Sequence, residues 1–197
     1  MIDDIAELEP LVPFRRWYAA AAQAEELAEA MTVATATKAG VPSLRAVLLR
    51  GLDERGFVFY TNLDSRKAEE LAQNPHTALC FHWKSMLRQV RIEGQVSRVA
   101  DAEADAYFAS RARESQIGAW ASDQSRPLAD RATLEMRLAE ATARFSGQDP
   151  VPRPANWSGY RVVPDRVEFW QELPHRLHDR LVFIRHGAEW RRERLFP

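Results

Sequence analysis

The chain has 197 residues, of which 46% are hydrophobic and 28% charged, with 27 basic against 28 acidic side chains. This composition is typical of a soluble globular protein and excludes a disordered chain. The formal net charge of −1 excludes nucleic-acid binding through bulk charge, and no apolar run is long enough to cross a membrane.

The first half of the chain predicts a helix followed by strands. Residues 13–31 are rich in Ala, Glu and Leu, which favours a helix with Pro13 near its start. Residues 32–37 are rich in β-branched side chains and predict a strand. Segments 43–52 and 56–61 then predict a hairpin.

The second half mixes strands and helices. We predict helices at 64–74, 101–111 and 127–145, and strands at 76–83, 87–99, 161–163, 167–171, 176–185 and 190–195. This order is mainly β with inserted helices and lacks regular β-α-β alternation, so it predicts an antiparallel sheet or barrel. The Pro-rich segment 146–156 is a connection inside one domain, 1–197, because too few residues follow it to form a second core.

Cysteine use and the N-terminus bear on the compartment. Cys80 stands alone in an apolar run, which excludes an intrachain disulfide and favours a buried, inert thiol over a nucleophile. The start MIDDIAELEP lacks the basic and apolar regions of a signal peptide. We therefore expect a cytoplasmic protein whose residues 1–12 form a flexible arm.

All but three of the 27 basic residues are arginine. Genome composition explains such an excess, and recognition of anions by the planar guanidinium is the alternative. In the segment Arg176-Leu177-His178-Asp179-Arg180, a strand would place the first, third and fifth side chains on one face. Two interpretations of this cationic face are open: it is exposed to solvent, or it forms the wall of a pocket beside Trp170. A metal site at His175 and His178 is disfavoured, because residues three apart on a strand face opposite ways.

A second candidate site is Ser65-Arg66-Lys67, at the start of the short helix predicted at 64–74. Free backbone N–H groups and the positive end of the helix dipole lie there, so two added cations favour phosphate binding. Basic residues at this end otherwise destabilise a helix, and such local violations occur at functional sites. The alternative is two surface cations that cost little stability.

A third candidate is the segment from Tyr107 to Gly118, where a helix is predicted to run into a polar loop. Its phenol, guanidinium and hydroxyl groups suit hydrogen bonding to an oxyanion. The sequence has no Gly-x-Ser-x-Gly motif, no convincing Ser-His-Asp order and no paired carboxylates in an apolar setting. With two anion-binding candidates and no nucleophile or metal cluster, the chemistry belongs to a bound cofactor.

Eight short motifs in order make the chain recognisable. They are Arg45-Ala-Val-Leu-Leu-Arg50, Phe59-Tyr60-Thr61-Asn62, Ser65-Arg66-Lys67-Ala68, Arg88-Gln89-Val90, Ser115-Gln116-Ile117-Gly118-Ala119-Trp120, Trp157-Ser158-Gly159-Tyr160, Glu168-Phe169-Trp170-Gln171 and Arg176-Leu177-His178-Asp179-Arg180. From about Pro10 to Pro197 the chain resembles the pyridoxine/pyridoxamine 5'-phosphate oxidases. The resemblance implies a split β-barrel fold and a homodimer with two flavin mononucleotide (FMN) sites built from both subunits.

The resemblance also implies roles by position. FMN binding falls to Arg45, Ala46, Val47, Leu48, Leu49, Arg50, Tyr60, Thr61, Arg66, Lys67, Gln89, Gln124, Ser125, Trp170 and Arg180. The resemblance assigns binding of the substrate's 5'-phosphate to Tyr107, Arg111 and Ser115. Substrate contacts also fall to Arg50, where the family has a lysine, and to Arg176, Leu177 and His178. Arg176 and His178 are the candidate catalytic residues, and no metal is implied.

The implied reaction passes a hydride from the substrate's C4' carbon to flavin N5, after which dioxygen reoxidises the flavin and yields hydrogen peroxide. The amine substrate also releases ammonia. Three departures from the family lie on the substrate side: a short N-terminal arm, Arg50 itself, and Glu172-Leu173-Pro174 in a turn that is usually glycine-rich. Two alternatives therefore stay open. One is an FMN oxidase acting on another heterocycle, such as a phenazine precursor; the other is a non-catalytic module that binds flavin or pyridoxal phosphate.

Overall fold

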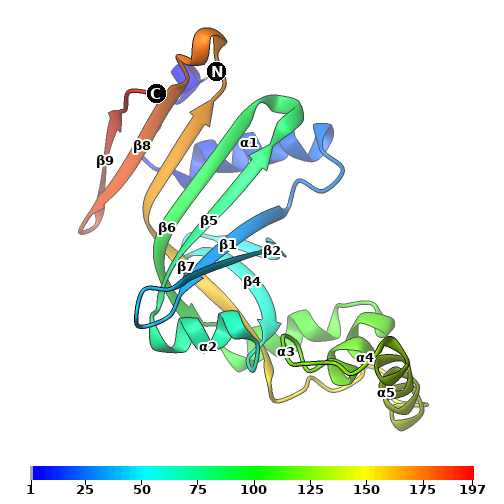
Figure 1. Cartoon of the computed structure of the whole chain (residues 1–197). Helices are drawn as coiled ribbons and strands as arrows, with labels where there is room; N and C mark the ends of the chain where they lie inside the picture. Colours follow the sequence, from blue (N-terminus) through cyan, green and yellow to red (C-terminus); the bar gives the residue numbers. More distant parts are fainter. Residues whose placement is uncertain (1) are drawn as a thin grey trace.

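An antiparallel sheet of nine strands organises residues 2–197, the part of the chain that the computed structural model describes (Figure 1). The elements are η1 (Ile2–Asp4), α1 (Leu11–Ala24), β1 (Ala30–Ala36), β2 (Pro42–Leu48), β3 (Gly51–Asp53), β4 (Gly56–Asn62), α2 (Arg66–Gln73), β5 (His76–Trp83), η2 (Lys84–Met86), β6 (Arg88–Arg98), α3 (Asp101–Ala109), α4 (Arg113–Ala121), α5 (Arg131–Arg144), β7 (Trp157–Gln171), η3 (Pro174–Arg176), β8 (Asp179–His186) and β9 (Glu189–Arg194). Among them no helix is long and apolar enough to span a membrane.

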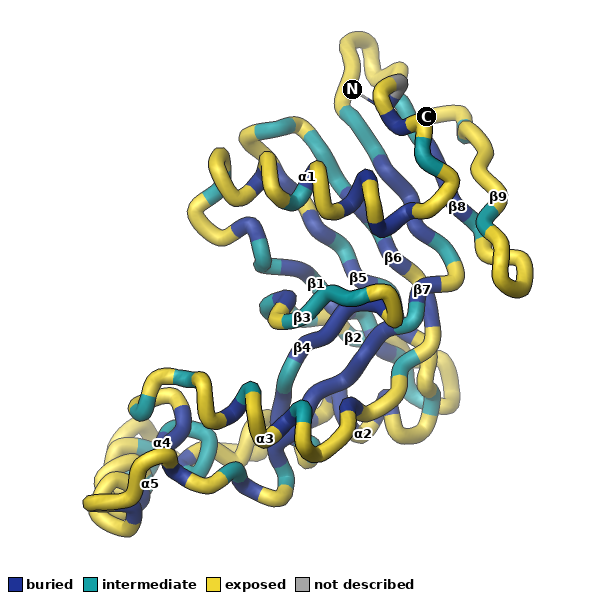
Figure 2. Tube along the Cα trace, turned by 180° about the vertical axis from the view of Figure 1, so that it is seen from behind, coloured by how far each residue is buried: buried dark blue, intermediate teal, exposed yellow. Residues whose placement is uncertain are grey.

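The long strand β7 joins the two halves of the sheet. The strand order is β2-β1-β5-β6-β7-β4-β3, and β8 pairs with both β7 and β9. Residues 157–162 of β7 pair with β4, residues 166–171 pair with β8, and β6 runs along the other side of both parts. The sheet therefore curls into a half-barrel, as Figures 1 and 2 show, and the predicted antiparallel sheet or barrel is confirmed.

A bulge in β7 at Asp165, opposite the step from Glu93 to Gly94 in β6, interrupts the pairing of the two strands. The register between the two strands shifts between Glu93 and Gly94. A Cβ atom at Gly94 would lie 2.0 Å from the carbonyl oxygen of Val163, so this close approach requires glycine. The segments 161–163 and 167–171, predicted as two strands, are parts of this one bent strand.

Helix α1 packs its apolar side on the sheet, seen from behind in Figure 2. Phe14 and Trp17 are buried. The Phe14 ring meets Phe57 edge-on at 4.9 Å, and Trp17 meets Phe169 edge-on at 5.2 Å. Such contacts add to the burial of large apolar area that stabilises the core.

The N-terminal segment packs on the same core. Ile2 and Ile5 are buried, and a guanidinium nitrogen of Arg192 donates to the carbonyl of Ile5 at 2.9 Å. The flexibility that we expected for residues 1–12 stays a prediction, and the structure describes only residues 2–12 of that arm.

Two boundary predictions in the first half are wrong. The first helix ends at Ala24 instead of residue 31, because Ala30 and Met31 pair with β2. Strand pairing here overrides the helix propensity of the local residues. The segment 43–52 is not a single strand of a hairpin: β2 pairs with β1, and only β3 pairs with β4.

Two helix predictions also need correction. The polar loop expected after α3 contains helix α4, whose apolar residues Ile117 and Ala121 pack with Phe145 and Val151. Helix α5 begins at Arg131, four residues later than predicted. These helices lie beyond one end of the sheet (Figure 1).

The strand predicted at 176–185 begins only at Asp179. Residues Pro174–Arg176 form a 3-10 turn, in which His175 and Arg176 have φ of 59° and 62°. This left-handed backbone is incompatible with a strand. The alternation expected along Arg176-Leu177-His178-Asp179-Arg180 is therefore wrong, and only Asp179 and Arg180 lie on β8.

Candidate functional site

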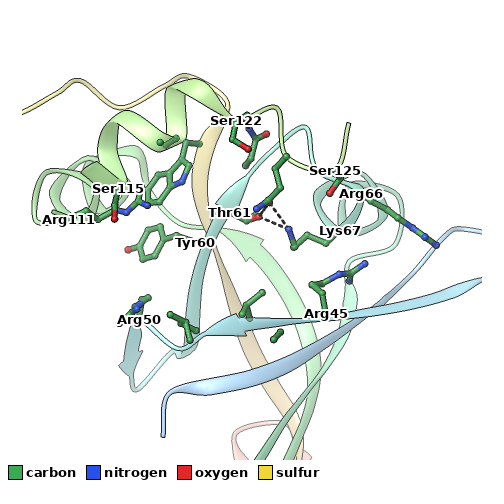
Figure 3. Close-up of a pocket in the computed structure, with 18 of the residues that line it drawn as sticks. Arg45, Arg50, Tyr60, Thr61, Arg66, Lys67, Arg111, Ser115, Ser122 and Ser125 are labelled. Atoms are coloured by element: carbon green, nitrogen blue, oxygen red, sulfur yellow. Dashed lines mark hydrogen bonds between the residues drawn. The ribbon is translucent and has the colours of Figure 1, made fainter. Parts of the chain in front are cut away.

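A cavity of about 1150 Å³ lies between β2, β4, α2 and the α3–α4 region (Figure 3). Its size is sufficient for a cofactor together with a small substrate. It brings together most of the residues predicted for the site: Arg45, Ala46, Val47, Leu48, Arg50, Tyr60, Thr61, Arg66, Lys67, Tyr107, Arg111, Ser115, Gln124 and Ser125. These residues come from segments more than sixty positions apart, so the fold assembles the cavity.

The other predicted site residues do not line this cavity: Leu49, Gln89, Trp170, Arg176, Leu177, His178 and Arg180. Leu49 is buried in the core. The remaining ones lie on β6, β7 and the segment from η3 to β8.

Three of these residues form a cross-strand row, which we call the Trp170 row. Gln89 pairs with Trp170, and Trp170 pairs with Arg180. The His178 ring lies 4.7 Å from the Trp170 ring, and its Nδ1 accepts a hydrogen bond from the backbone N–H of Leu173. Leu177 beside it is 65% exposed. One chain therefore carries two separate groups of predicted site residues.

One end of the cavity, the Lys67 end, is built around a buried ammonium. Lys67 is 6% exposed, and its Nζ donates to Thr61 at 3.0 Å, to Ser65 at 3.2 Å and to Gln124 at 2.7 Å. Burial, with the nearby charge of Arg45, lowers the pKa of Lys67 to about 8. A desolvated cation at the start of α2 is suited to bind an anion.

Glu70 organises the arginines of the Lys67 end. Its buried carboxylate accepts hydrogen bonds from the hydroxyls of Thr35 and Ser43 and from Nε of Arg66, and lies 3.5 Å from a guanidinium nitrogen of Arg45. Arg45 in turn donates to the same two hydroxyls. Burial alone would raise the pKa of Glu70, but these hydrogen bonds outweigh it and lower the pKa to about 2. The network fixes Arg45 and Arg66 before any ligand binds.

We expect Glu70→Gln to lower the free energy of unfolding by about 2 kcal/mol at pH 7, because the arginines lose their buried counter-charge. The carboxyl titrates near 2 in the folded chain against 4.5 without the network. Its contribution is therefore complete above pH 4.5 and is lost as the pH falls toward 2. Urea unfolding of both proteins should show a difference that shrinks over that range.

The exposed Glu69, which pairs with Arg126, is the matched control on the same helix. Glu69→Gln should change the free energy of unfolding by less than about 0.5 kcal/mol. A Glu70→Gln deficit that is independent of pH would contradict the titration that we assign.

The opposite end, the Arg111 end, is built around a guanidinium that lacks a full set of partners. Arg111 stacks over the Trp157 ring at 4.9 Å and the Phe108 ring at 5.4 Å. Its buried NH1 has no hydrogen-bond partner among the described residues, and burial lowers its pKa. Ser115 lines the cavity beside it (Figure 3). A buried donor without a partner is costly, so this end is prepared for an acceptor from a ligand.

Three stacked aromatic rings stand at the Arg111 end. Tyr60 stacks on Tyr107 at 4.0 Å and on Trp157 at 5.2 Å, with interplanar angles of 12° and 5°. A Cβ atom on Gly159 would lie 2.8 Å from the Tyr60 ring, so this glycine allows the stack. Burial raises the pKa of Tyr60 to about 12, so its hydroxyl stays neutral.

Trp157 lines the cavity but was not among the predicted site residues. The motif Trp157-Ser158-Gly159-Tyr160 was visible in the sequence without a role attached. The stacking of Trp157 under Arg111 gives the tryptophan of this motif a role. Across residues 2–197 no group of His, Cys, Asp and Glu is arranged to hold a metal ion.

The family models agree with this geometry. Residues 19–145 match the pyridoxamine 5'-phosphate oxidase model. The chain belongs to this family. Residues 157–197, which include the Trp170 row apart from Gln89, match the model of a pyridoxine 5'-phosphate oxidase C-terminal dimerisation region.

Individual relatives of the family cover nearly all of the chain. A protein of Sphingopyxis alaskensis named pyridoxine/pyridoxamine 5'-phosphate oxidase is 61% identical over 96% of this chain and 88% of its own length. A protein of Rhodospirillum rubrum with the same name is 54% identical over 100% of both chains.

Solved structures share the fold. PhzG of Burkholderia lata, solved with tetrahydrophenazine-1-carboxylic acid, matches with a TM-score of 0.92 at 33% identity over 98% of this chain and 95% of its own. An FMN-binding protein of Nostoc punctiforme matches with a TM-score of 0.78 at 18% identity, over 97% of this chain and 100% of its own. The split-barrel fold expected from the motifs is confirmed.

Proposed function

We propose that the chain is an FMN-dependent oxidase that converts pyridoxine 5'-phosphate or pyridoxamine 5'-phosphate into pyridoxal 5'-phosphate, with dioxygen as the electron acceptor. The products include hydrogen peroxide and, from the amine, ammonia. The observation that carries this proposal is one cavity with two separate cationic ends, around Lys67 and Arg111 (Figure 3). Two ends of this kind suit two phosphate groups, one on the cofactor and one on the substrate.

The Lys67 end fits the phosphate of FMN. Arg45, Arg66 and Lys67 line it, and Lys67 supplies a buried ammonium whose present partners are neutral oxygens. Residues 45–48, Arg50, Tyr60, Thr61, Gln124 and Ser125 would hold the rest of the cofactor. Bound FMN would supply the two-electron oxidation, which side chains by themselves do not provide.

The Arg111 end fits the phosphate of the vitamin. Arg111 would donate through its free NH1, with the hydroxyls of Tyr107 and Ser115 beside it. Arg50 lines the same cavity and lies 3.6 Å from Glu29. Fixing the phosphate sets the position of the substrate's reacting carbon, and such positioning is the protein's main contribution to rate.

We further propose a homodimer in which the Trp170 row, with Arg176, Leu177 and His178, completes the cavity of the partner subunit. The dimerisation-region match at 157–197 supports this arrangement. So does the separation of the two groups within one chain. Arg176 and His178 would then cover the substrate ring and orient its proton.

The test is to purify the protein, record its visible spectrum, and follow oxygen uptake and hydrogen peroxide with both phosphorylated substrates. We expect a flavin spectrum and turnover of at least one substrate. A protein that cannot be loaded with FMN would overturn the proposal. A yellow protein inert toward both substrates would favour an oxidase of another heterocycle or a binding module. The similarity to PhzG, solved with tetrahydrophenazine-1-carboxylic acid, would point to the first of these.

A further inference from the structure

The side chain of Gln116, for which the motifs suggested no role, lies beneath the turn between α3 and α4. It is 2% exposed. Its amide nitrogen donates to the carbonyl oxygens of Phe108 and Ala109 at 3.1 Å and of Arg111 at 3.0 Å. Its Oε1 accepts a hydrogen bond from the backbone N–H of Val151 at 3.1 Å. One buried amide therefore connects three backbone segments: the end of α3, the turn and the linker after α5.

These bonds give partners to carbonyl oxygens at the end of α3 and in the turn, of which the Phe108 oxygen also accepts from the backbone N–H of Arg111 at 3.2 Å. The last carbonyls of a helix have no partner within the helix. Phe108 and Ala109 are the last two residues of α3, and Arg111 follows in the turn. Because two amide hydrogens serve three carbonyl oxygens, the three oxygens must converge on one point.

The phosphate-binding side chains extend from this same piece of backbone. Tyr107 precedes the first tied carbonyl, Arg111 carries the third, and Ser115 is the neighbour of Gln116 in the first turn of α4. The NH1 of Arg111 has no partner in the described residues, so ring stacking and the backbone are what orient its guanidinium.

We infer that Gln116 is a positioning residue: it holds the α3–α4 turn so that Tyr107, Arg111 and Ser115 meet the substrate's phosphate. The inference rests on the proposed function and adds a residue that does not line the cavity itself. Its effect should be specific to the phosphate of the substrate and should spare the phosphate of FMN, because the Lys67 end takes no part in the turn. A small displacement of such groups costs considerable binding and rate.

The test is Gln116→Met, which keeps the volume and removes all four side-chain hydrogen bonds. With FMN bound, we expect KM for pyridoxamine 5'-phosphate to rise about tenfold, which corresponds to about 1.4 kcal/mol, with kcat changed less than about threefold. A direct readout is the ratio of the dissociation constants of pyridoxal and pyridoxal 5'-phosphate. That ratio should fall about tenfold, while FMN affinity stays within about twofold.

The matched control is Val151→Ala, which loosens the same linker but keeps the backbone N–H that Gln116 accepts. Val151 is buried in the small core of α4 and α5, so its truncation destabilises the same region. At temperatures where the protein is folded, Val151→Ala should leave the ratio of the dissociation constant of pyridoxal to that of pyridoxal 5'-phosphate unchanged. Should Gln116→Met not fold, Gln116→Asn, whose amide is one methylene too short to keep all four hydrogen bonds, carries the same expectations.

The outcomes separate the two proposals. A wild-type protein that neither oxidises the phosphorylated substrates nor prefers pyridoxal 5'-phosphate over pyridoxal overturns the proposed function, and this inference with it. If the wild type is active and the Gln116 variant has the same ratio of dissociation constants as the wild type, the positioning role alone is overturned. An equal fall in the ratio for Val151→Ala would reduce Gln116 to a stability residue.

Discussion

Arg111→Met should lower kcat/KM for pyridoxamine 5'-phosphate by about two to three orders of magnitude while FMN stays bound. Each hydrogen bond from a charged donor contributes about 1.5–3 kcal/mol, and Arg111 can offer two to a phosphate. The loss should be large because the guanidinium is already desolvated and stacked on Trp157 before the substrate arrives. Steady-state oxygen uptake gives the kinetic constants, and flavin fluorescence gives cofactor retention.

Arg144→Met is the matched control. Arg144 also stacks over a tryptophan and a phenylalanine, Trp120 at 4.7 Å and Phe145 at 5.0 Å, but it does not line the large cavity. It should leave kcat/KM within about twofold of the wild type. Loss of FMN from the Arg111 variant would instead assign this residue to the cofactor.

Lys67→Met should weaken FMN binding by about a hundredfold, because the buried ammonium contributes a charge-assisted hydrogen bond at the Lys67 end. Fluorescence titration of the apoprotein with FMN measures this affinity. The exposed Lys84, which is outside the cavity, provides the control Lys84→Met, for which we expect unchanged affinity. Unchanged affinity in the Lys67 variant would contradict its phosphate role.

The same lysine predicts a pH dependence. Its pKa in the free protein is lowered to about 8, so it is protonated below that pH and neutral above it. Because a phosphate binds the protonated form, FMN affinity should be constant just below pH 8 and fall as the pH rises above it, by at most tenfold per unit. In Lys67→Met this fall should be absent.

The charge arrangement explains how a chain of net charge −1 can bind two anions. Glu70 neutralises part of the Lys67 end and holds its arginines in place, whereas Arg111 is held by aromatic rings. The two ends are therefore prepared in different ways. The first should respond to acid through Glu70, and the second should depend on packing and on the turn that Gln116 ties.

Local signals in the sequence predicted several elements well. The strand at 76–83 was predicted with its observed ends, and the helix α2 was predicted to begin with Arg66 and Lys67 in its first turn. The latter indicated a site because basic residues at a helix start are repelled by the positive end of the helix dipole and are therefore unfavourable without an anion. Helix α4 was missed because its polar first turn reads as a loop, and its few apolar residues find partners only in α5 and the linker.

The sequence by itself determined the family, the mainly β fold and the membership of most of the cavity, because short motifs and local propensities are properties of neighbouring residues. Only the tertiary structure decided which residues meet. It placed Trp157 under Arg111, Glu70 between two arginines and Gln116 beneath the turn, and it separated the Trp170 row from the cavity. The contacts of Arg111 with Trp157, of Arg45 with Glu70 and of Gln116 with Val151 join segments tens of residues apart. The pairing of strands and the packing of distant segments set these contacts, and no local pattern encodes either. The segment before β8 depends instead on left-handed backbone at His175 and Arg176.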